Sequence, residues 1–277
     1  MVSSHYGRDA MHCVSTFLQK STFNLSAKII VLLIVFFSSS FVISWAQPDQ
    51  THFFSFCPSA PIVKDHQGNT YRTVQIGSQC WMAENMRCVT SPTGKHWRVN
   101  PTFSATQPEY GAYYAIPNDS RFGLLYNWTA AMDLASHHNS PKALPKPVRG
   151  ICPEGWHIPD NNDWEKLFQT MGGHPMSGEM MKAFTLLWDP YDVNQKEHIG
   201  FDALPAGDYT ENGYHHAGQQ TTFWSADNFS RIEAWSCTVY DFKTEGYNYL
   251  NYKCYGHSVR CVKDDEAQMG AGLIRTP

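Results

Sequence analysis

The chain has 277 residues, of which 42% are hydrophobic and 17% are charged, and its formal net charge at pH 7 is −4. This apolar fraction is typical of a globular protein and excludes disorder along the whole chain. The small negative charge argues against a nucleic-acid-binding protein, and a mean hydropathy of −0.40 argues against many membrane spans.

An apolar run near the N-terminus, Ile29–Phe37, follows the basic residue Lys28. Ser44 and Ala46 then supply small residues at the −3 and −1 positions of a cleavage site. This pattern predicts a signal peptide over residues 1–46, cleaved after Ala46, and hence a secreted or cell-surface protein. An uncleaved anchor is the alternative, although the segment is shorter than the ~20 apolar residues that a membrane span needs.

The first part of the exported chain predicts a linker followed by a β-hairpin. Residues 47–60 are polar and contain proline, as a linker would. Residues 62–65 and 70–76 are strand-like, and Gln67-Gly68-Asn69 between them supplies turn residues. Cys80-Trp81-Met82 continues the apolar course.

The middle of the chain predicts less regular structure. Residues 90–120 are rich in Pro, Asn, Thr and Tyr, which is typical of a long loop. Residues 124–134 are apolar and alanine-rich, which favours a short helix or turn. Residues 141–149 hold three prolines and can be neither regular helix nor central strand.

The clearest helix is predicted after residue 160. Asn162 and Glu165 have capping-box spacing, and Gly172-Gly173 provides a stop. Four apolar residues fall on one helical face, namely Trp164, Leu167, Phe168 and Met171. A second short helix is expected over residues 179–184.

From Phe201 onward the chain is predicted to be rich in β-structure. The candidate strands are residues 223–225, 232–240, 247–252 and 257–262. Few helices, many short strands and long loops predict a single α+β domain over residues 61–264, with a tail over residues 265–277.

Six ordered motif blocks carry a resemblance to a known family. In chain order they are Asp65-x-x-Gly68-Asn69-x-Tyr71, Gln79-Cys80-Trp81-Met82-Ala83-Glu84-Asn85-Met86-Arg87, Gly123-x-Leu125-Tyr126-Asn127-Trp128, Cys152-Pro153-Glu154-Gly155-Trp156-His157-Ile158-Pro159, Phe201-x-Ala203-Leu204-Pro205-x-Gly207 with Phe223-Trp224-Ser225, and Ser258-Val259-Arg260-Cys261-Val262. The chain resembles the Fibrobacter succinogenes major paralogous domain. The resemblance implies an exported protein, mostly found in Bacteroidetes and Fibrobacteres, without an established activity. It also implies a C-type-lectin-like fold in which the closing strand pairs with the start of the domain.

Seven cysteines follow residue 46, so at least one is unpaired if disulfides form after export. Cys152 and Cys261 lie in two of the most specific blocks, and we expect them to form a disulfide. Cys237 could pair with Cys254 across a hairpin, and Cys80 could pair with Cys88 in a small loop, which would leave Cys57 over. Spacing alone does not decide these connectivities.

Tryptophan is unusually frequent, and most of it is expected in the core. The residues in the motif blocks are Trp81, Trp128, Trp156, Trp164 and Trp224. Each large ring buries about 150–250 Å² when packed, so core packing is favoured over sugar stacking. Trp97 lies in the polar loop and is the candidate for an exposed, ligand-contacting ring.

Tyr and Asn are concentrated in residues 240–255, and both residue types dominate recognition loops. The predicted ligand contacts there are Tyr247, Tyr249, Asn251 and Tyr252, together with Asp227 and Asn228 earlier in the chain. A twisted strand pair with solvent-facing Tyr is the alternative interpretation. The resemblance adds that some lectin-like relatives diversify this region for ligand binding.

No metal and no cofactor is expected from the sequence. His137-His138 and His215-His216 are adjacent pairs, and neighbouring side chains in a strand or helix point to different faces. The Glu-Pro-Asn and Trp-Asn-Asp triplets of calcium-binding lectins are absent, and the motifs of zinc proteases, P-loops and dinucleotide sites are absent as well.

These observations favour a non-catalytic recognition module that binds a surface glycan or protein ligand and meets the membrane only through its export signal. A structural component of the envelope or fimbriae is one alternative. Another is an enzyme like the formylglycine-generating copper oxidases, which share a distantly similar fold; Cys254 and Cys261 would then be the copper-binding pair.

Overall fold

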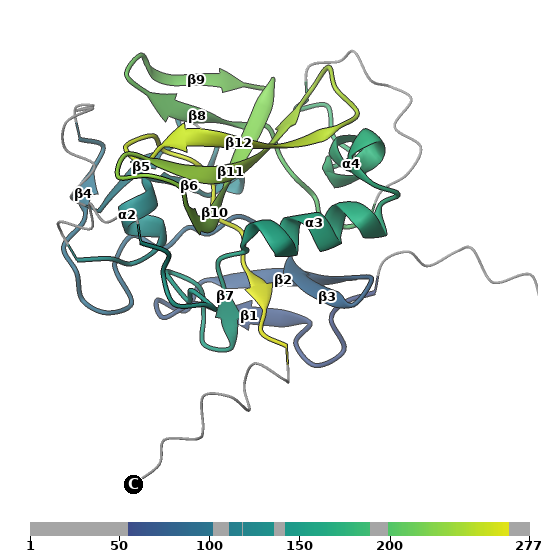
Figure 1. The fold of residues 1–277 in the computed structure, drawn as a ribbon, viewed down its shortest axis with the longest axis horizontal. Helices are drawn as coiled ribbons and strands as arrows, with labels where there is room; N and C mark the ends of the chain where they lie inside the picture. Colours follow the sequence, from purple (N-terminus) through teal and green to yellow (C-terminus); the bar gives the residue numbers. More distant parts are fainter. Residues whose placement is uncertain (1–54, 102–110, 118, 136–141, 189–198, 266–277) are drawn as a thin grey trace, which may run out of the picture. The chain divides into compact units, whose positions relative to one another are not determined.

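The computed structural model describes residues 55–101, 111–117, 119–135, 142–188 and 199–265 (Figure 1). The predicted signal peptide, the predicted tail beyond residue 265 and the His137-His138 pair lie outside these residues. Within the described ranges, no helix is long and apolar enough to cross a membrane.

The first sheet joins the beginning and the end of the domain, with the strand order β1-β2-β3-β13-β7. Its strands are β1 (Ile62–Lys64), β2 (Thr70–Ile76), β3 (Gln79–Met82), β7 (Trp156–His157) and β13 (Val262–Lys263). The predicted hairpin is present as β1 and β2. Val262 lies opposite Trp81, so the closing strand pairs with the start of the domain, as the resemblance implied.

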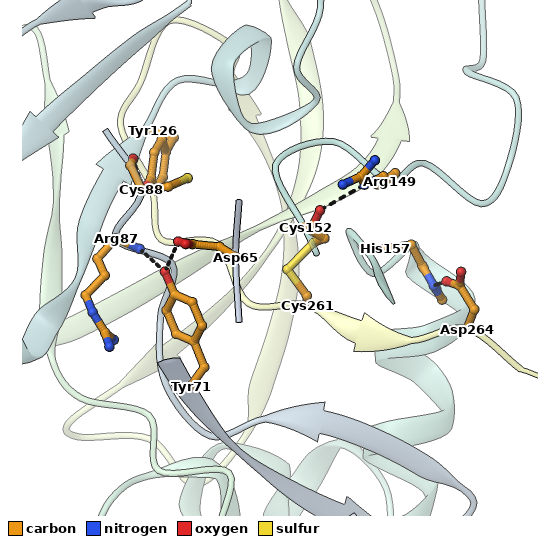
Figure 2. The surroundings of a disulfide bond; sticks show 10 residues. All are labelled: Asp65, Tyr71, Arg87, Cys88, Tyr126, Arg149, Cys152, His157, Cys261 and Asp264. Carbon is orange, nitrogen blue, oxygen red and sulfur yellow. Dashed lines mark hydrogen bonds and ion pairs between the residues drawn. A yellow bond between two sulfur atoms is a disulfide. The ribbon is translucent and has the colours of Figure 1, made fainter. Parts of the chain in front are cut away.

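The turn between β1 and β2 explains the first motif block. Gly68 adopts φ +84°, a conformation that favours glycine. The buried carboxylate of Asp65 accepts a hydrogen bond from the backbone of Asn69 at 2.9 Å. It accepts another from the hydroxyl of Tyr71 at 2.7 Å, which is drawn in Figure 2. The first motif block therefore stabilises the turn between β1 and β2.

The second sheet has the strand order β12-β11-β10-β8-β9. Its strands are β8 (Ala206–Thr210), β9 (Gly213–Ala217), β10 (Gln220–Asn228), β11 (Glu233–Tyr240) and β12 (Gly246–Tyr252). Three of the four predicted strands correspond to β10, β11 and β12. The prediction for residues 257–262 was too long, because His257 and Ser258 form only isolated bridges before β13.

Two short strands of a small third sheet lie within the predicted loop over residues 90–120. Its strands are β4 (Arg98–Val99), β5 (Ala112–Ala115) and β6 (Leu124–Tyr126), followed by helix α2 (Trp128–Ala131); the short helix η1 (Ser120–Phe122) precedes β6. Trp97 is only 6% exposed, and its ring packs edge-on against Tyr113 and Tyr126. The prediction that Trp97 is an exposed contact residue is wrong, because long-range packing buries it.

Helix α3 (Asn161–Thr170) lies between the two five-stranded sheets (Figure 1). Its predicted apolar face is fully buried. The cap differs from the prediction: Asp160 and Asp163, rather than Asn162 and Glu165, form the capping box. Helix α4 (His174–Met181) also begins before the predicted residue 179.

All five tryptophans predicted for the core are buried, with exposed fractions between 0% and 3%. The predicted disulfide between Cys152 and Cys261 is present and is drawn in Figure 2. It ties the loop before α3 to the strand that closes the domain.

The other two predicted disulfides are wrong. Cys80 bonds to Cys57 and not to Cys88, because Ser55 pairs with Gln75, whose other neighbour is Cys80. Cys57, which was expected to stay unpaired, therefore attaches the end of the predicted linker to the domain.

Cys237 and Cys254 also stay unpaired, and both are buried together with Cys88. On β11, Cys237 lies opposite Asn248, six residues before Cys254 along the chain. Extended chain rises about 3.3 Å per residue, so the register of the hairpin separates these two thiols.

A buried polar network connects two motif blocks. The guanidinium of Arg260, which is 1% exposed, donates two hydrogen bonds to the Oδ1 atom of Asn85, at 2.6 and 3.1 Å, and one to the carbonyl of Phe201. Asn85 in turn donates to the Oγ atom of Ser258 at 3.2 Å and to the carbonyl of Phe122 at 2.9 Å. Burial lowers the pKa of Arg260 to about 9. The hydrogen bonds from its guanidinium to these partners replace those that it would make to water.

His157 is clamped between two carboxylates, one of which is drawn in Figure 2. Its Nδ1 atom lies 2.6 Å from Asp264, and its Nε2 atom lies 3.2 Å from Asp163. Burial opposes protonation, but the two carboxylates outweigh it and raise the pKa of His157. The charged imidazole therefore fastens β13 to the first turn of α3.

We expect His157→Gln to destabilise the domain more at low pH than at high pH. A raised pKa gives stability that is fully present below the unfolded pKa of about 6.5 and is lost as the pH rises through the folded pKa. The loss should be about 1–2 kcal/mol near pH 6 and smaller near pH 9, measured by urea unfolding. His174→Gln is the control, because its ion pair with Glu165 is nearly half exposed and such pairs contribute little. Equal losses of unfolding free energy at both pH values would contradict a stabilising role for the ion pairs of His157 with Asp163 and Asp264.

Candidate functional site

Three tyrosines and one lysine form a cluster at the β12 side of the second sheet. We call Tyr240, Tyr247, Tyr249 and Lys243 the tyrosine face. The rings of Tyr247 and Tyr249 stack with centroids 5.6 Å apart, and Tyr240 stands edge-on to both. The ammonium of Lys243 lies 4.5 Å from the ring centroid of Tyr247 and 4.8 Å from that of Tyr240. The cluster offers flat aromatic surface beside a positive charge.

The sheet geometry explains which predicted residues share this face. Side chains alternate along a strand, so Tyr247, Tyr249 and Asn251 point to one side of β12 and Tyr252 points to the other. Tyr249 is 36% exposed and Tyr252 is 45% exposed. The amide of Asn251 donates to the Oγ atom of Ser236 at 2.8 Å, which fixes its orientation. The predicted set is therefore divided between two faces.

Asp227 and Asn228 have structural contacts at the end of β10. The carboxylate of Asp227 accepts a hydrogen bond from the first backbone N–H of α3, at 2.8 Å from Asn161, and pairs with Lys146. The amide of Asn228 donates to the carbonyl of Lys142 at 3.0 Å. These contacts hold the proline-rich segment against the sheet, and the structure does not join either residue to the tyrosine face.

A second polar cluster lies at the opposite side of the same sheet. Asp208 on β8 pairs in register with His215 on β9. The Oδ1 atom of Asp208 is 3.4 Å from the Nε2 atom of His215 and 2.9 Å from the Nδ1 atom of His216. We call these three residues the histidine cluster.

The expectation that His215 and His216 point to different faces is wrong. His216 adopts φ +58°, which is outside the strand region and interrupts the alternation. Opposite it, Gly207 also has a positive φ, and a Cβ atom there would lie 2.3 Å from the carbonyl oxygen of His215. Both imidazoles consequently reach the same carboxylate oxygen.

His257 lies buried beside this cluster, at 1% exposure. Neither of its ring nitrogens reaches a partner with hydrogen-bond geometry among the described residues. Burial lowers the pKa of His257 to about 4, against the opposing effects of Asp208 and the Gly256 backbone. The imidazole is neutral at physiological pH, and its ring lies against Trp224 at a centroid distance of 4.5 Å.

The sequence contains a signal that could have located the histidine cluster. Asn212-Gly213 is a strong hairpin dipeptide, and a hairpin does form here. Its turn is Glu211-Asn212, one residue earlier, and this register brings Asp208 opposite His215. The strands were missed because few of their residues are apolar, so no alternation marks them. The positive φ of His216 has no comparable signal.

A cleft of about 730 Å³ opens elsewhere on the domain, between the first sheet and the segments around η1 and residue 202. Four arginines line it, and several are already paired: Arg72 binds Glu84 and Asp202, and Arg121 binds Asp119. Its volume suits a small ligand, but its charges are satisfied largely within the protein.

The cysteines offer little nucleophilic chemistry. Cys261 is held in a disulfide with Cys152, so it does not form a copper-binding pair with Cys254. Burial raises the pKa of Cys88 to about 12 and that of Cys254 to about 11. Thiolates are the reactive form, and these environments disfavour them.

Comparison with known proteins gives one match. A family model described as the Fibrobacter succinogenes major domain matches residues 74–263. No curated protein and no solved structure matches significantly. The match spans most of both five-stranded sheets and includes the tyrosine face and the histidine cluster.

Proposed function

The chain belongs to the Fibrobacter succinogenes major domain family, and from that premise we propose that it is an exported, non-catalytic recognition module. The module binds a glycan or protein ligand through the tyrosine face. Family membership assigns no activity, so the proposal rests on the geometry of the site.

The tyrosine face is the observation that carries this proposal. β12 is the outermost strand on its side of the sheet, and Tyr247 and Tyr249 stack on it in neighbouring same-face positions. Tyrosine supplies large contact area at low entropic cost, and its hydroxyl can form hydrogen bonds. Lys243 adds a positive charge that would favour acidic groups on the ligand.

Export and a C-type-lectin-like fold belong to the same proposal. Two disulfides fit an oxidising compartment. The pairing of β13 with β3, next to a second sheet with an accessible face, fits the arrangement of lectin-like domains. The surroundings of the free thiols favour binding over covalent chemistry.

The test is a glycan and protein array with the purified, oxidised protein, with and without calcium, followed by affinity measurements on the hits. We expect a saturable hit whose affinity falls at least ~10-fold when Tyr247 and Tyr249 are both replaced by Ala, as for buried aromatic contacts in interfaces. The melting temperature should change little, because Tyr249 is exposed and Tyr247 is only partly buried.

Tyr252→Ala is the matched control, since Tyr252 lies on the same strand, is also exposed and points to the other face. Its affinity should equal that of the unmodified protein. Full binding by the Tyr247→Ala, Tyr249→Ala double variant would exclude the tyrosine face. A blank array with folded protein would favour the structural envelope component instead.

A further inference from the structure

The histidine cluster has the geometry of a metal site. A tetrahedral zinc ion with bonds of about 2.0–2.1 Å holds its ligand atoms about 3.3 Å apart. The measured separations from the Asp208 oxygen are 2.9 and 3.4 Å, and all three candidate ligand atoms lie within 4.8 Å of one another. Two edges of this triangle of donors thus have about the length that a tetrahedral zinc site needs, and the third edge, between the two imidazole nitrogens, is at most 4.8 Å.

The buried negative charge of Asp208 favours a bound cation. The carboxylate of Asp208 is buried, and its only ion-pair partners in the described residues are His215 and His216. A buried carboxylate needs a compensating positive charge. Two imidazole nitrogens and a carboxylate oxygen that converge in this way can all be satisfied by one divalent ion between them.

The unmet hydrogen bonds around the cluster also point to an occupant. The Nδ1 atom of His215 and both ring nitrogens of His257 are buried without a partner in the described part of the chain. A buried polar group that is left unpaired destabilises the fold. The bridge between Tyr209 and Gly256 places His257 next to the strand that carries Asp208. A water on the open position of a bound ion is a partner that could reach it.

We propose that Asp208, His215 and His216 bind one Zn²⁺ ion, with a fourth coordination position left open to water or to a donor atom of a ligand. Two imidazole nitrogens and one carboxylate oxygen are a donor set that zinc accepts. The His216 side chain is 46% exposed, so the ion can enter from solvent. This inference does not depend on the tyrosine face.

The experiment is calorimetric titration of ZnCl₂ into purified protein from which metal has been removed with a chelator. We expect one ion per chain, and a loss of affinity of more than ~100-fold in the His215→Ala, His216→Ala double variant. The control is the His66→Ala, His96→Ala double variant, which removes two exposed histidines outside the cluster. Its zinc affinity should be unchanged.

His216→Gly separates ligation from folding. Glycine accepts the positive φ at this position without strain, so the melting temperature of the metal-free protein should be unchanged or higher while zinc affinity falls. Cobalt substitution adds a spectroscopic readout: a four-coordinate site gives strong visible absorption, and a six-coordinate site gives weak absorption. Absence of stoichiometric zinc binding by folded protein, or equal affinity in the His215→Ala, His216→Ala variant, would overturn the proposal.

Discussion

Replacement of both Cys152 and Cys261 by Ala should lower the free energy of unfolding by about 5 kcal/mol. The two cysteines are 109 residues apart, and a cross-link that closes a long loop removes much entropy from the unfolded chain. Both side chains are fully buried, so alanine introduces no exposed group. Urea unfolding of the oxidised proteins measures the difference.

The second disulfide provides the matched comparison. Cys57 and Cys80 are 23 residues apart, and the same chain-entropy argument gives about 3 kcal/mol for the Cys57→Ala, Cys80→Ala variant. We therefore expect the Cys152 pair to be the more important one. The reverse order would show that loop length does not determine the stabilisation here.

Asn85→Ala is expected to destabilise the domain by about 3 kcal/mol, because it leaves the guanidinium of Arg260 buried without two of its hydrogen bonds. It also removes the bond to Ser258 that joins the two motif blocks. Chemical denaturation at neutral pH is the measurement.

A double variant distinguishes this network from simple loss of packing. Combining Asn85→Ala with Arg260→Met removes the buried charge together with its partner. In the native protein the guanidinium carbon of Arg260 lies 4.4 Å from the ring centroid of Phe201, and the long methionine side chain can still cover this ring. The double variant should lose less than the sum of the two single losses, by about 1–3 kcal/mol. Additive losses would show that the two residues are not coupled.

Local patterns predicted the elements that local forces build. The turn residues around Gly68, between two strand-like segments, predicted the β1–β2 hairpin. Helical spacing predicted the buried face of α3 at Trp164 and Leu167. The bond between Cys152 and Cys261 was expected because both lie in specific motif blocks, and it is present.

The errors share a physical origin in long-range geometry. Cys57 forms a disulfide with Cys80 only because an isolated bridge at Ser55 brings the two residues together. Trp97 is buried by the third sheet, whose strands have two to four residues and leave no periodic pattern. The convergence of His215 and His216 depends on one backbone angle. Side-chain alternation within β12 could have been used to separate Tyr252 from the other predicted contacts.

The position of β13 between β3 and β7 has a consequence for biosynthesis. The first sheet stays incomplete until residue 262 has been made, because β3 and β7 are joined only through β13. Strands so far apart in the sequence cannot complete this sheet before residue 262 has been made, however fast the later folding steps are. If the chain is exported as we propose, its first strands would enter the translocation channel before this sheet can be completed.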